Sequence, residues 1–254
     1  MSLYTKLCTS IAKCIFKKSS VSYEIPPEEG ETAVYLCNHS GAFGPANMTL
    51  WFDKPHMTWL INYTLNKKKN ANFVYHDFFF GRSRKCKPFW RALSKIVAVF
   101  LRPLLLDSKP IPVYHDMRIT STFDKSLNAL QNGENIVIFP ECPTKYSEFI
   151  NDVYSGFADL GRTYANQTGK ALKFYPVYVA HPFHKILIGK PISYNTAIPQ
   201  KLQRDDIAKY VRDNIDRMAR SLPPHKPAPF LPQRWYDYYG EYENDVASYW
   251  KLFE

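Results

Sequence analysis

Hydrophobic and polar positions follow two different periods along the chain, and these periods predict strands and helices in turn. Short apolar runs between turn-forming residues indicate buried strands, and apolar residues three or four apart indicate helices with one buried face. Strands are predicted at 32–37, 57–61, 111–114, 135–139, 172–179 and 185–192, and helices at 119–131, 153–167 and 199–222. This alternation predicts a single α/β domain with a mixed, mainly parallel sheet flanked by helices.

The two ends of the chain differ from this body. In the first twenty residues Leu3, Leu7 and Ile11 recur at helical spacing with lysines mostly on other faces, which predicts a basic amphipathic helix. Such a helix either lies on a membrane surface or docks on its own domain. The end of the chain is rich in proline and then in aromatic residues, which predicts a strap that packs on the domain or an aromatic belt at a membrane interface. The expected divisions are an N-terminal basic amphipathic helix (1–24), the α/β domain (25–222) and an aromatic C-terminal strap (223–254).

Composition restricts the class of partner. A net charge of +10 with 16% aromatic residues indicates a polyanion, either nucleic acid or an anionic membrane surface. No nucleic-acid recognition motif is present, so nucleic acid is not expected. The five cysteines show no CxxC spacing and are expected to be reduced thiols of a cytoplasmic protein. The longest apolar stretch, 96–106, is interrupted by Arg102 and Pro103 and is shorter than the roughly 20 residues of a spanning helix. The expected location is therefore cytoplasmic, on the inner face of the membrane as a peripheral protein.

The segment with the clearest chemistry is Asn38-His39-Ser40-Gly41, directly after the strand predicted at 32–37. Open α/β sheets place their active sites at the carboxyl ends of strands. An imidazole there can act as a general base near neutral pH, although a histidine in this position can also be purely structural.

Three further blocks follow in order: the apolar strand at 111–114, Phe139-Pro140-Glu141, and the proline-containing strand at 175–179. This order resembles the glycerolipid (lysophospholipid) acyltransferase family, which includes 1-acylglycerol-3-phosphate acyltransferases. The family's first block is Asn-His, four residues, then Asp, and its third is Phe-Pro-Glu-Gly followed by Thr-Arg. The resemblance spans about residues 32–192. It implies transfer of a fatty acyl chain from acyl-CoA or acyl-carrier protein to a hydroxyl of a lysophospholipid or related lipid, with no metal or tightly bound cofactor.

The same resemblance assigns roles to individual residues. His39 becomes the general base that deprotonates the acceptor hydroxyl, without an acyl-enzyme, and Glu141 positions the acceptor or supports the base. Turn amides near Ser40 and Gly41 are placed to stabilise the developing oxyanion. The substrate-binding candidates are Asn38, Ser40, Gly41, His115, Arg118, Pro140, Cys142 and Lys145.

One departure from the family concerns the base. The family's Asp, five residues after its His, is replaced by Gly44. A carboxylate there would orient the imidazole and stabilise its protonated form. Its possible substitutes are Glu141, Asp116 and Asp77, and Glu141 is favoured because it and His39 follow strands at what should be the same sheet edge. If no carboxylate takes that place, the alternative is a catalytically silent membrane-lipid-binding protein on the acyltransferase fold.

A second departure concerns the acceptor. His115 replaces the arginine of the second block, and the third block lacks both its Gly and its Arg. The bidentate clamp for an acceptor phosphate is therefore altered, with Lys145, Arg118 or a protonated His115 as substitutes. The acceptor is accordingly not expected to be simply a lysophosphatidic acid. The basic cluster at 82–87 is a candidate for meeting the phosphates of CoA or an acidic carrier protein.

Two other features of the sequence do not predict a metal site or a nucleophile. His181 and His184 lie three residues apart without the acidic or cysteine neighbours of a metal site, so no metal is expected there. Cys142 has no histidine in its block and is expected to be a structural thiol rather than a nucleophile.

Overall fold

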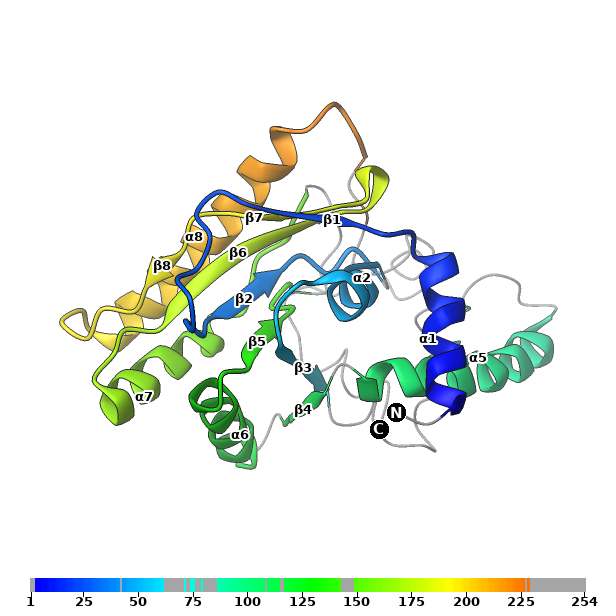
Figure 1. The fold of residues 1–254 in the computed structure, drawn as a ribbon, viewed down its shortest axis with the longest axis horizontal. Helices are drawn as coiled ribbons and strands as arrows, with labels where there is room; N and C mark the ends of the chain where they lie inside the picture. Colours follow the sequence, from blue (N-terminus) through cyan, green and yellow to red (C-terminus); the bar gives the residue numbers. More distant parts are fainter. Residues whose placement is uncertain are drawn as a thin grey trace.

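One mixed β-sheet organises the chain in the computed structural model, which describes residues 3–41, 43–61, 71, 74–75, 79, 86–107, 109–114, 117–142, 149–226 and 228. Within these residues the sheet has eight strands in the order β1-β7-β6-β2-β5-β3-β4, and β8 pairs with β6 (Figure 1). The central strands are parallel, and β7 and β8 run antiparallel to β6. The α/β fold with a mixed, mainly parallel sheet is therefore confirmed.

The strands are short and come from all parts of the described chain. Their bounds are β1 (Ser20–Tyr23), β2 (Val34–Cys37), β3 (His56–Ile61), β4 (Pro110–Val113), β5 (Asn135–Ile138), β6 (Lys173–Ala180), β7 (Lys185–Ile188) and β8 (Ile192–Ser193). The helices are α1 (Leu3–Ile15), α2 (Phe43–Trp51), α5 (Lys87–Asp107), α6 (Ile119–Gln131), α7 (Asp159–Thr168) and α8 (Gln200–Arg220), with short 3-10 turns η2 (Gly156–Ala158) and η3 (His181–Phe183).

The central strands are buried on both faces, which explains their continuous apolar runs. Val34 and Leu36 of β2 face one core cluster, which α6, α7 and α8 complete. Tyr35 and Cys37 alternate with them and face the second cluster, to which α2 contributes Met48. The helices therefore cover both faces of the sheet, as a parallel sheet requires.

Most predicted elements are confirmed, and α6 has the predicted bounds because Asn132 and Gly133 end it. Two predictions are corrected. The helix expected at 153–167 begins only at η2. Val153 forms an antiparallel β-bridge with Glu141, and the Tyr154 N–H donates to the Pro140 carbonyl at 2.8 Å, so Val153 and Tyr154 are not helical. The strand expected at 185–192 is divided into β7 and β8, which pair with opposite ends of β6.

Among the strands and α-helices of the described residues, β1, α2 and α5 were not predicted. Residues 20–23, which the sequence pattern grouped with the N-terminal helix, form β1 and pair in parallel with β7. The helix α1 itself ends at Ile15. No helix in the described parts of the chain combines the length and the apolar content that crossing a membrane would need.

Several predictions fall outside the described residues. They concern most of the C-terminal strap and the segments that contain Asp77, His115, Asp116 and Lys145, together with the basic cluster up to residue 85.

Candidate active site

His39 and Glu141 meet at the carboxyl edge of the sheet, although they are 102 positions apart in the sequence. The parallel pairing of β2 with β5 sets Leu36 opposite Ile138, and each of the two polar residues follows three positions later. The backbone N–H of His39 donates to Glu141 Oε2 at 2.8 Å. The register of two neighbouring strands thus brings the first and third sequence blocks together.

Glu141 is buried, with 3% of its surface exposed, and it accepts two backbone hydrogen bonds. One comes from His39 and the other from the Asn151 N–H, which donates to Oε1 at 3.0 Å. Burial raises the pKa of the carboxyl to about 7, and the two N–H donors oppose that shift. The carboxylate therefore links the turn after β2, at His39, to the loop after β5, at Asn151.

The imidazole of His39 is oriented by a backbone carbonyl. Its Nδ1 lies 2.7 Å from the Gly41 carbonyl oxygen. Since a carbonyl oxygen only accepts, Nδ1 carries the proton and Nε2 keeps its lone pair. Burial lowers the pKa of the imidazole to about 4, although the Gly41 hydrogen bond acts in the opposite direction. His39 is therefore a neutral imidazole with a basic Nε2 at pH 7.

This arrangement differs from the expected contact between Glu141 and the ring. The Glu141 carboxylate binds the main chain of His39, and the Gly41 carbonyl binds Nδ1. The other two proposed substitutes, Asp77 and Asp116, lie outside the described residues.

Ser40 and Gly41 form a tight turn between β2 and α2, with φ values of 46° and 57°. The buried Asn38 amide fastens this turn to β6, because its Oδ1 accepts the Val179 N–H at 2.7 Å and its Nδ2 donates to Ser40 Oγ at 2.6 Å. In the described part of the chain, the N–H groups of Ser40 and Gly41 donate no hydrogen bond. Two amide donors beside a basic imidazole match the requirement for stabilising an oxyanion.

Gly44 occupies the position of the family's Asp, and the backbone leaves it no room for a side chain. Its N–H donates to the His39 carbonyl oxygen at 3.1 Å. A Cβ atom at this position would lie 2.2 Å from that oxygen and 2.8 Å from the Asn38 carbonyl oxygen. An aspartate therefore does not fit this turn unless the backbone moves. Glycine at position 44 is therefore the residue that this turn geometry accommodates.

The third block supplies mainly backbone contacts. The Pro140 carbonyl accepts the Tyr154 N–H, and the Cys142 N–H donates to the Asp152 carbonyl at 2.8 Å. Burial raises the pKa of the Cys142 thiol to about 11, so it is protonated at neutral pH and a poor nucleophile. The structural role of this thiol stays a prediction.

Arg118 lies at the same sheet edge, after β4, and two strands separate β4 from β2. Its guanidinium carbon sits 4.5 Å from the centre of the Tyr114 ring. His115 and Lys145, the other candidates for binding a phosphate, are outside the described residues.

The structure also adds residues that sequence reasoning missed. Asn151 holds Glu141 through its backbone, a contact without side-chain chemistry and therefore without a sequence signal. Phe43, the first residue of α2, stacks on His181 with ring centres 3.5 Å apart. His181 thus packs against the helix that follows the site.

A cavity of about 340 Å³ opens elsewhere, lined by Gly30, Thr32, Leu130, Gln131, Gly133, Tyr164, Thr168 and Lys170. Thr32 precedes β2 and Gly133 precedes β5, so this cavity lies at the amino edge of the sheet. It is separate from the edge that carries His39.

Comparisons with known proteins leave the function open. No family model matches the chain. No curated protein matches it either. Among solved structures, the chain is similar to the 1-acyl-sn-glycerophosphate (LPA) acyltransferase PlsC from Thermotoga maritima, at 16% identity and a TM-score of 0.47. The match covers 87% of this chain and 81% of that chain. A likeness this low assigns no activity, so a function has to be argued from the residues.

Proposed function

We propose that this chain is an acyltransferase that moves a fatty acyl group from acyl-CoA or acyl-carrier protein to a hydroxyl of a lysophospholipid or related lipid. The observation that carries the proposal is the pairing of His39 with Glu141 at one sheet edge, with an unprotonated Nε2 on the imidazole. The order of the four sequence blocks supplies the reaction class, and the tertiary structure adds a geometry that suits it.

In the proposed reaction His39 Nε2 takes the proton from the acceptor hydroxyl. The resulting alkoxide oxygen attacks the thioester carbonyl and forms a C–O bond. The Ser40 and Gly41 N–H groups stabilise the oxyanion of the tetrahedral intermediate. When the intermediate collapses, the C–S bond breaks and the leaving thiolate takes the proton back from His39. No acyl-enzyme and no metal are needed.

Glu141 acts as a positioning residue in this proposal, because its carboxylate holds the backbone of His39. The Gly41 carbonyl keeps Nδ1 protonated, which is the task that a carboxylate performs in a triad. A neutral carbonyl stabilises an imidazolium less than a carboxylate does, so His39 remains a weak base. Its low pKa keeps it in the basic form at neutral pH.

The test measures transfer from acyl-CoA and from acyl-carrier protein to a panel of lysolipids, comparing wild type with His39→Ala and His56→Ala. His56 is a matched control, since it is half-buried, its Nδ1 lies 2.9 Å from the Lys54 carbonyl oxygen, and it begins β3 at the amino edge. Loss of a general base is expected to reduce kcat about 10²- to 10⁴-fold in His39→Ala. His56→Ala should retain wild-type kcat.

Two outcomes contradict the proposal in different ways. Transfer that survives in His39→Ala excludes this residue as the base. A wild-type chain that transfers no acyl group from either donor, yet still binds lipid, favours the catalytically silent lipid-binding protein instead.

A further inference from the structure

Two helices on one side of the molecule expose large apolar side chains to solvent. On α1, Leu7, Ile11 and Ile15 are spaced four residues apart, and Leu7 and Ile15 are 56% and 67% exposed. On α5, Phe89 and Ile96 are 60% and 57% exposed, and Val99, Phe100 and Leu106 are exposed as well. A monomeric soluble protein rarely gathers so many exposed apolar residues, and such patches mark interaction surfaces.

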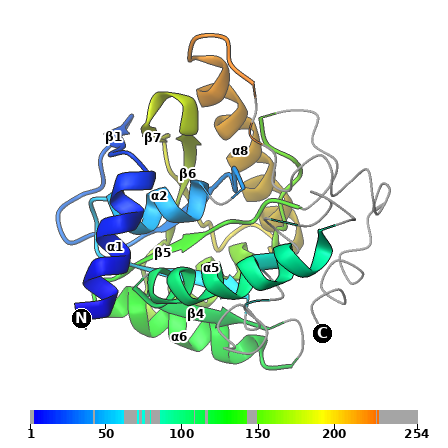
Figure 2. The ribbon, with the colours of Figure 1, turned by 90° about the vertical axis from the view of Figure 1, so that its right-hand side faces the viewer.

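The two exposed stripes belong to one surface. Both helices lie on the same side of the molecule and α1 packs against α5 (Figure 2). The Tyr4 hydroxyl donates to the Val99 carbonyl oxygen at 2.9 Å, which joins the two helices within the exposed area. Each helix also has a packed side, with Cys8 and Ala12 buried on α1 and Ala98 buried on α5. The exposed side chains of α1 and α5 together are called the α1–α5 face below.

Basic residues surround the α1–α5 face, and the two helices with the residues that adjoin them contribute little negative charge. Across residues 3–18 and 87–107 the sequence holds a single acidic residue, Asp107. The exposed basic residues of these segments are Lys6, Lys13, Lys17, Lys18, Lys87, Arg91 and Lys95. Among the described residues, none of the ion pairs involves any of them.

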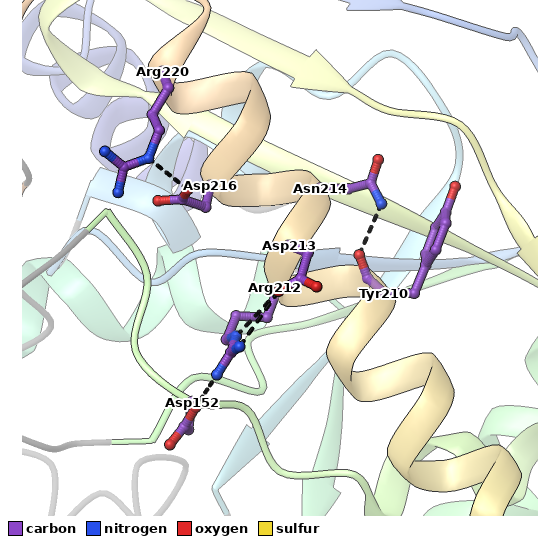
Figure 3. Close-up of polar contacts among 7 residues, drawn as sticks. All are labelled: Asp152, Tyr210, Arg212, Asp213, Asn214, Asp216 and Arg220. Carbon is purple, nitrogen blue, oxygen red and sulfur yellow. Dashed lines mark hydrogen bonds and ion pairs between the residues drawn. The ribbon is translucent and has the colours of Figure 1, made fainter.

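The arginines of helix α8, in contrast, have acidic partners within the protein. Arg212 pairs with Asp152 at 2.6 Å, and Arg220 pairs with Asp216 at 2.6 Å (Figure 3). Arg217 pairs with Glu24 at 2.8 Å. The charge on α8 is therefore largely neutralised within the protein, whereas the charge around the α1–α5 face is available to an external anion.

We propose that the α1–α5 face docks on an anionic lipid bilayer. Apolar side chains flanked by lysines fit the boundary between acyl chains and anionic headgroups, where both kinds of contact form at once. A protein partner would have to supply a matching apolar surface with an acidic rim. This inference extends beyond the N-terminal helix, because α5 supplies half of the surface.

The face also adjoins the candidate active site. Phe16, just after α1, contacts Phe43 at the start of α2 with ring centres 5.4 Å apart. The Trp51 Nε1–H at the other end of α2 donates to the Phe16 carbonyl oxygen at 3.0 Å. Since α2 begins next to Gly44, docking through α1 would bring the site edge toward the lipid surface. This part of the inference rests on the proposed function, and bilayer binding itself does not.

The test is vesicle co-sedimentation with phosphatidylcholine alone and with phosphatidylcholine mixed with phosphatidylglycerol. Binding is expected only with the anionic vesicles, and it should weaken as salt rises. Leu7→Ser/Ile96→Ser should lower the partition coefficient about tenfold or more through lost apolar contact. Lys6→Gln/Lys95→Gln should lower it about fivefold for each lysine removed.

Matched controls come from α8. Leu202 is 57% exposed, so Leu202→Ser removes an equivalent side chain, and Lys201→Gln/Lys209→Gln removes two exposed lysines. These variants should bind as wild type does. Since all substituted side chains are exposed, each variant is expected to fold as wild type does. A thermal melt that matches wild type checks this for each variant.

The outcomes separate this inference from the proposed function. Equal binding of neutral and anionic vesicles, or equal loss in the α8 variants, overturns the α1–α5 face as a docking surface. Self-association in solution that Leu7→Ser/Ile96→Ser abolishes, without any vesicle binding, also overturns it and assigns the face to a second copy of the chain. Vesicle binding without acyl transfer leaves this inference standing and contradicts only the enzymatic proposal.

Discussion

Gly44 leaves space for the carbonyl oxygen of His39, because a glycine has no side chain to collide with it. A Cβ atom there would approach that oxygen to 2.2 Å. The imidazole takes the Gly41 carbonyl as its partner within the same turn. The missing side chain at Gly44 and the carbonyl-bound Nδ1 are thus two parts of one local geometry.

Substituting Gly44 tests this steric argument. Gly44→Ala should lower the free energy of unfolding by about 1–3 kcal/mol, because the added methyl overpacks the turn. Gly156→Ala is the control, since a Cβ at position 156 meets nothing within 4 Å. It should change stability by less than about 1 kcal/mol. Urea unfolding followed by circular dichroism measures both, and equal stability of Gly44→Ala and wild type would show that the turn relaxes freely.

Glu141 links the site to the pH dependence of stability. Burial raises its folded-state pKa to about 7, above the ordinary value of 4.5. The folded chain therefore holds this proton more tightly than the unfolded chain does. The stabilisation is fully present below pH 4.5 and is lost as pH rises through 7.

Replacing this group with a neutral one should remove that contribution. Between pH 5 and pH 8 the wild-type free energy of unfolding should fall by about 2–3 kcal/mol more than that of Glu141→Gln. Glu29→Gln, at an exposed position, should follow wild type. Urea unfolding at the two pH values measures the difference. A wild-type pH profile in Glu141→Gln would mean that the buried carboxyl titrates near its ordinary pKa.

Among the secondary-structure elements, β1 and α1 are adjacent in sequence but differ in how they attach. β1 extends the sheet beside β7, and the Glu24 N–H donates to the Ile188 carbonyl oxygen at 2.8 Å. The buried Ser19 hydroxyl donates to Asn47 Oδ1 at 2.6 Å. α1 instead packs on α5. The structural boundary within the N-terminal segment therefore lies between α1 and β1.

Two truncations distinguish this boundary from one after residue 24. Removing residues 2–15 should leave a cooperatively folded protein that no longer binds anionic vesicles strongly. Removing residues 2–24 also takes away β1 with Val21 and Tyr23, which pack on the second core cluster. The longer truncation should lower the free energy of unfolding by at least about 2 kcal/mol more than the shorter one. Equal stability of the two proteins would place β1 outside the folded domain.

The molecule as a whole distributes its net charge of +10 unevenly. The helix α8 carries Asp205, Asp206, Asp213 and Asp216 beside its basic residues, and its arginines have acidic partners. The helices α1 and α5 together hold a single acidic residue, Asp107, and their lysines form no ion pairs within the described residues. An uneven field orients a protein on an anionic surface and speeds its encounter with an anionic donor. The structure therefore shows an uneven distribution of charge that composition does not convey.

Hydrophobic pattern alone predicts the central strands, the class of fold and the edge where the polar residues gather. Val34–Cys37 and Asn135–Ile138 are continuous apolar runs, and such runs are buried on both faces only in the middle of a sheet. Residues that follow neighbouring parallel strands must then lie at one edge, which brought His39 and Glu141 together. The α5 helix is not predicted from the sequence, because Arg102 and Pro103 interrupt its apolar stretch.

Three-dimensional packing sets which atoms meet at that edge and which apolar faces remain exposed. Glu141 binds a backbone N–H rather than a ring nitrogen, a distinction set by the register of β2 against β5. The space at Gly44 depends on two carbonyl oxygens that no side-chain pattern reveals. The apolar side chains of α1 and α5 look like ordinary core residues in the sequence. Their exposure follows from packing, because each helix buries only the face that its neighbours cover.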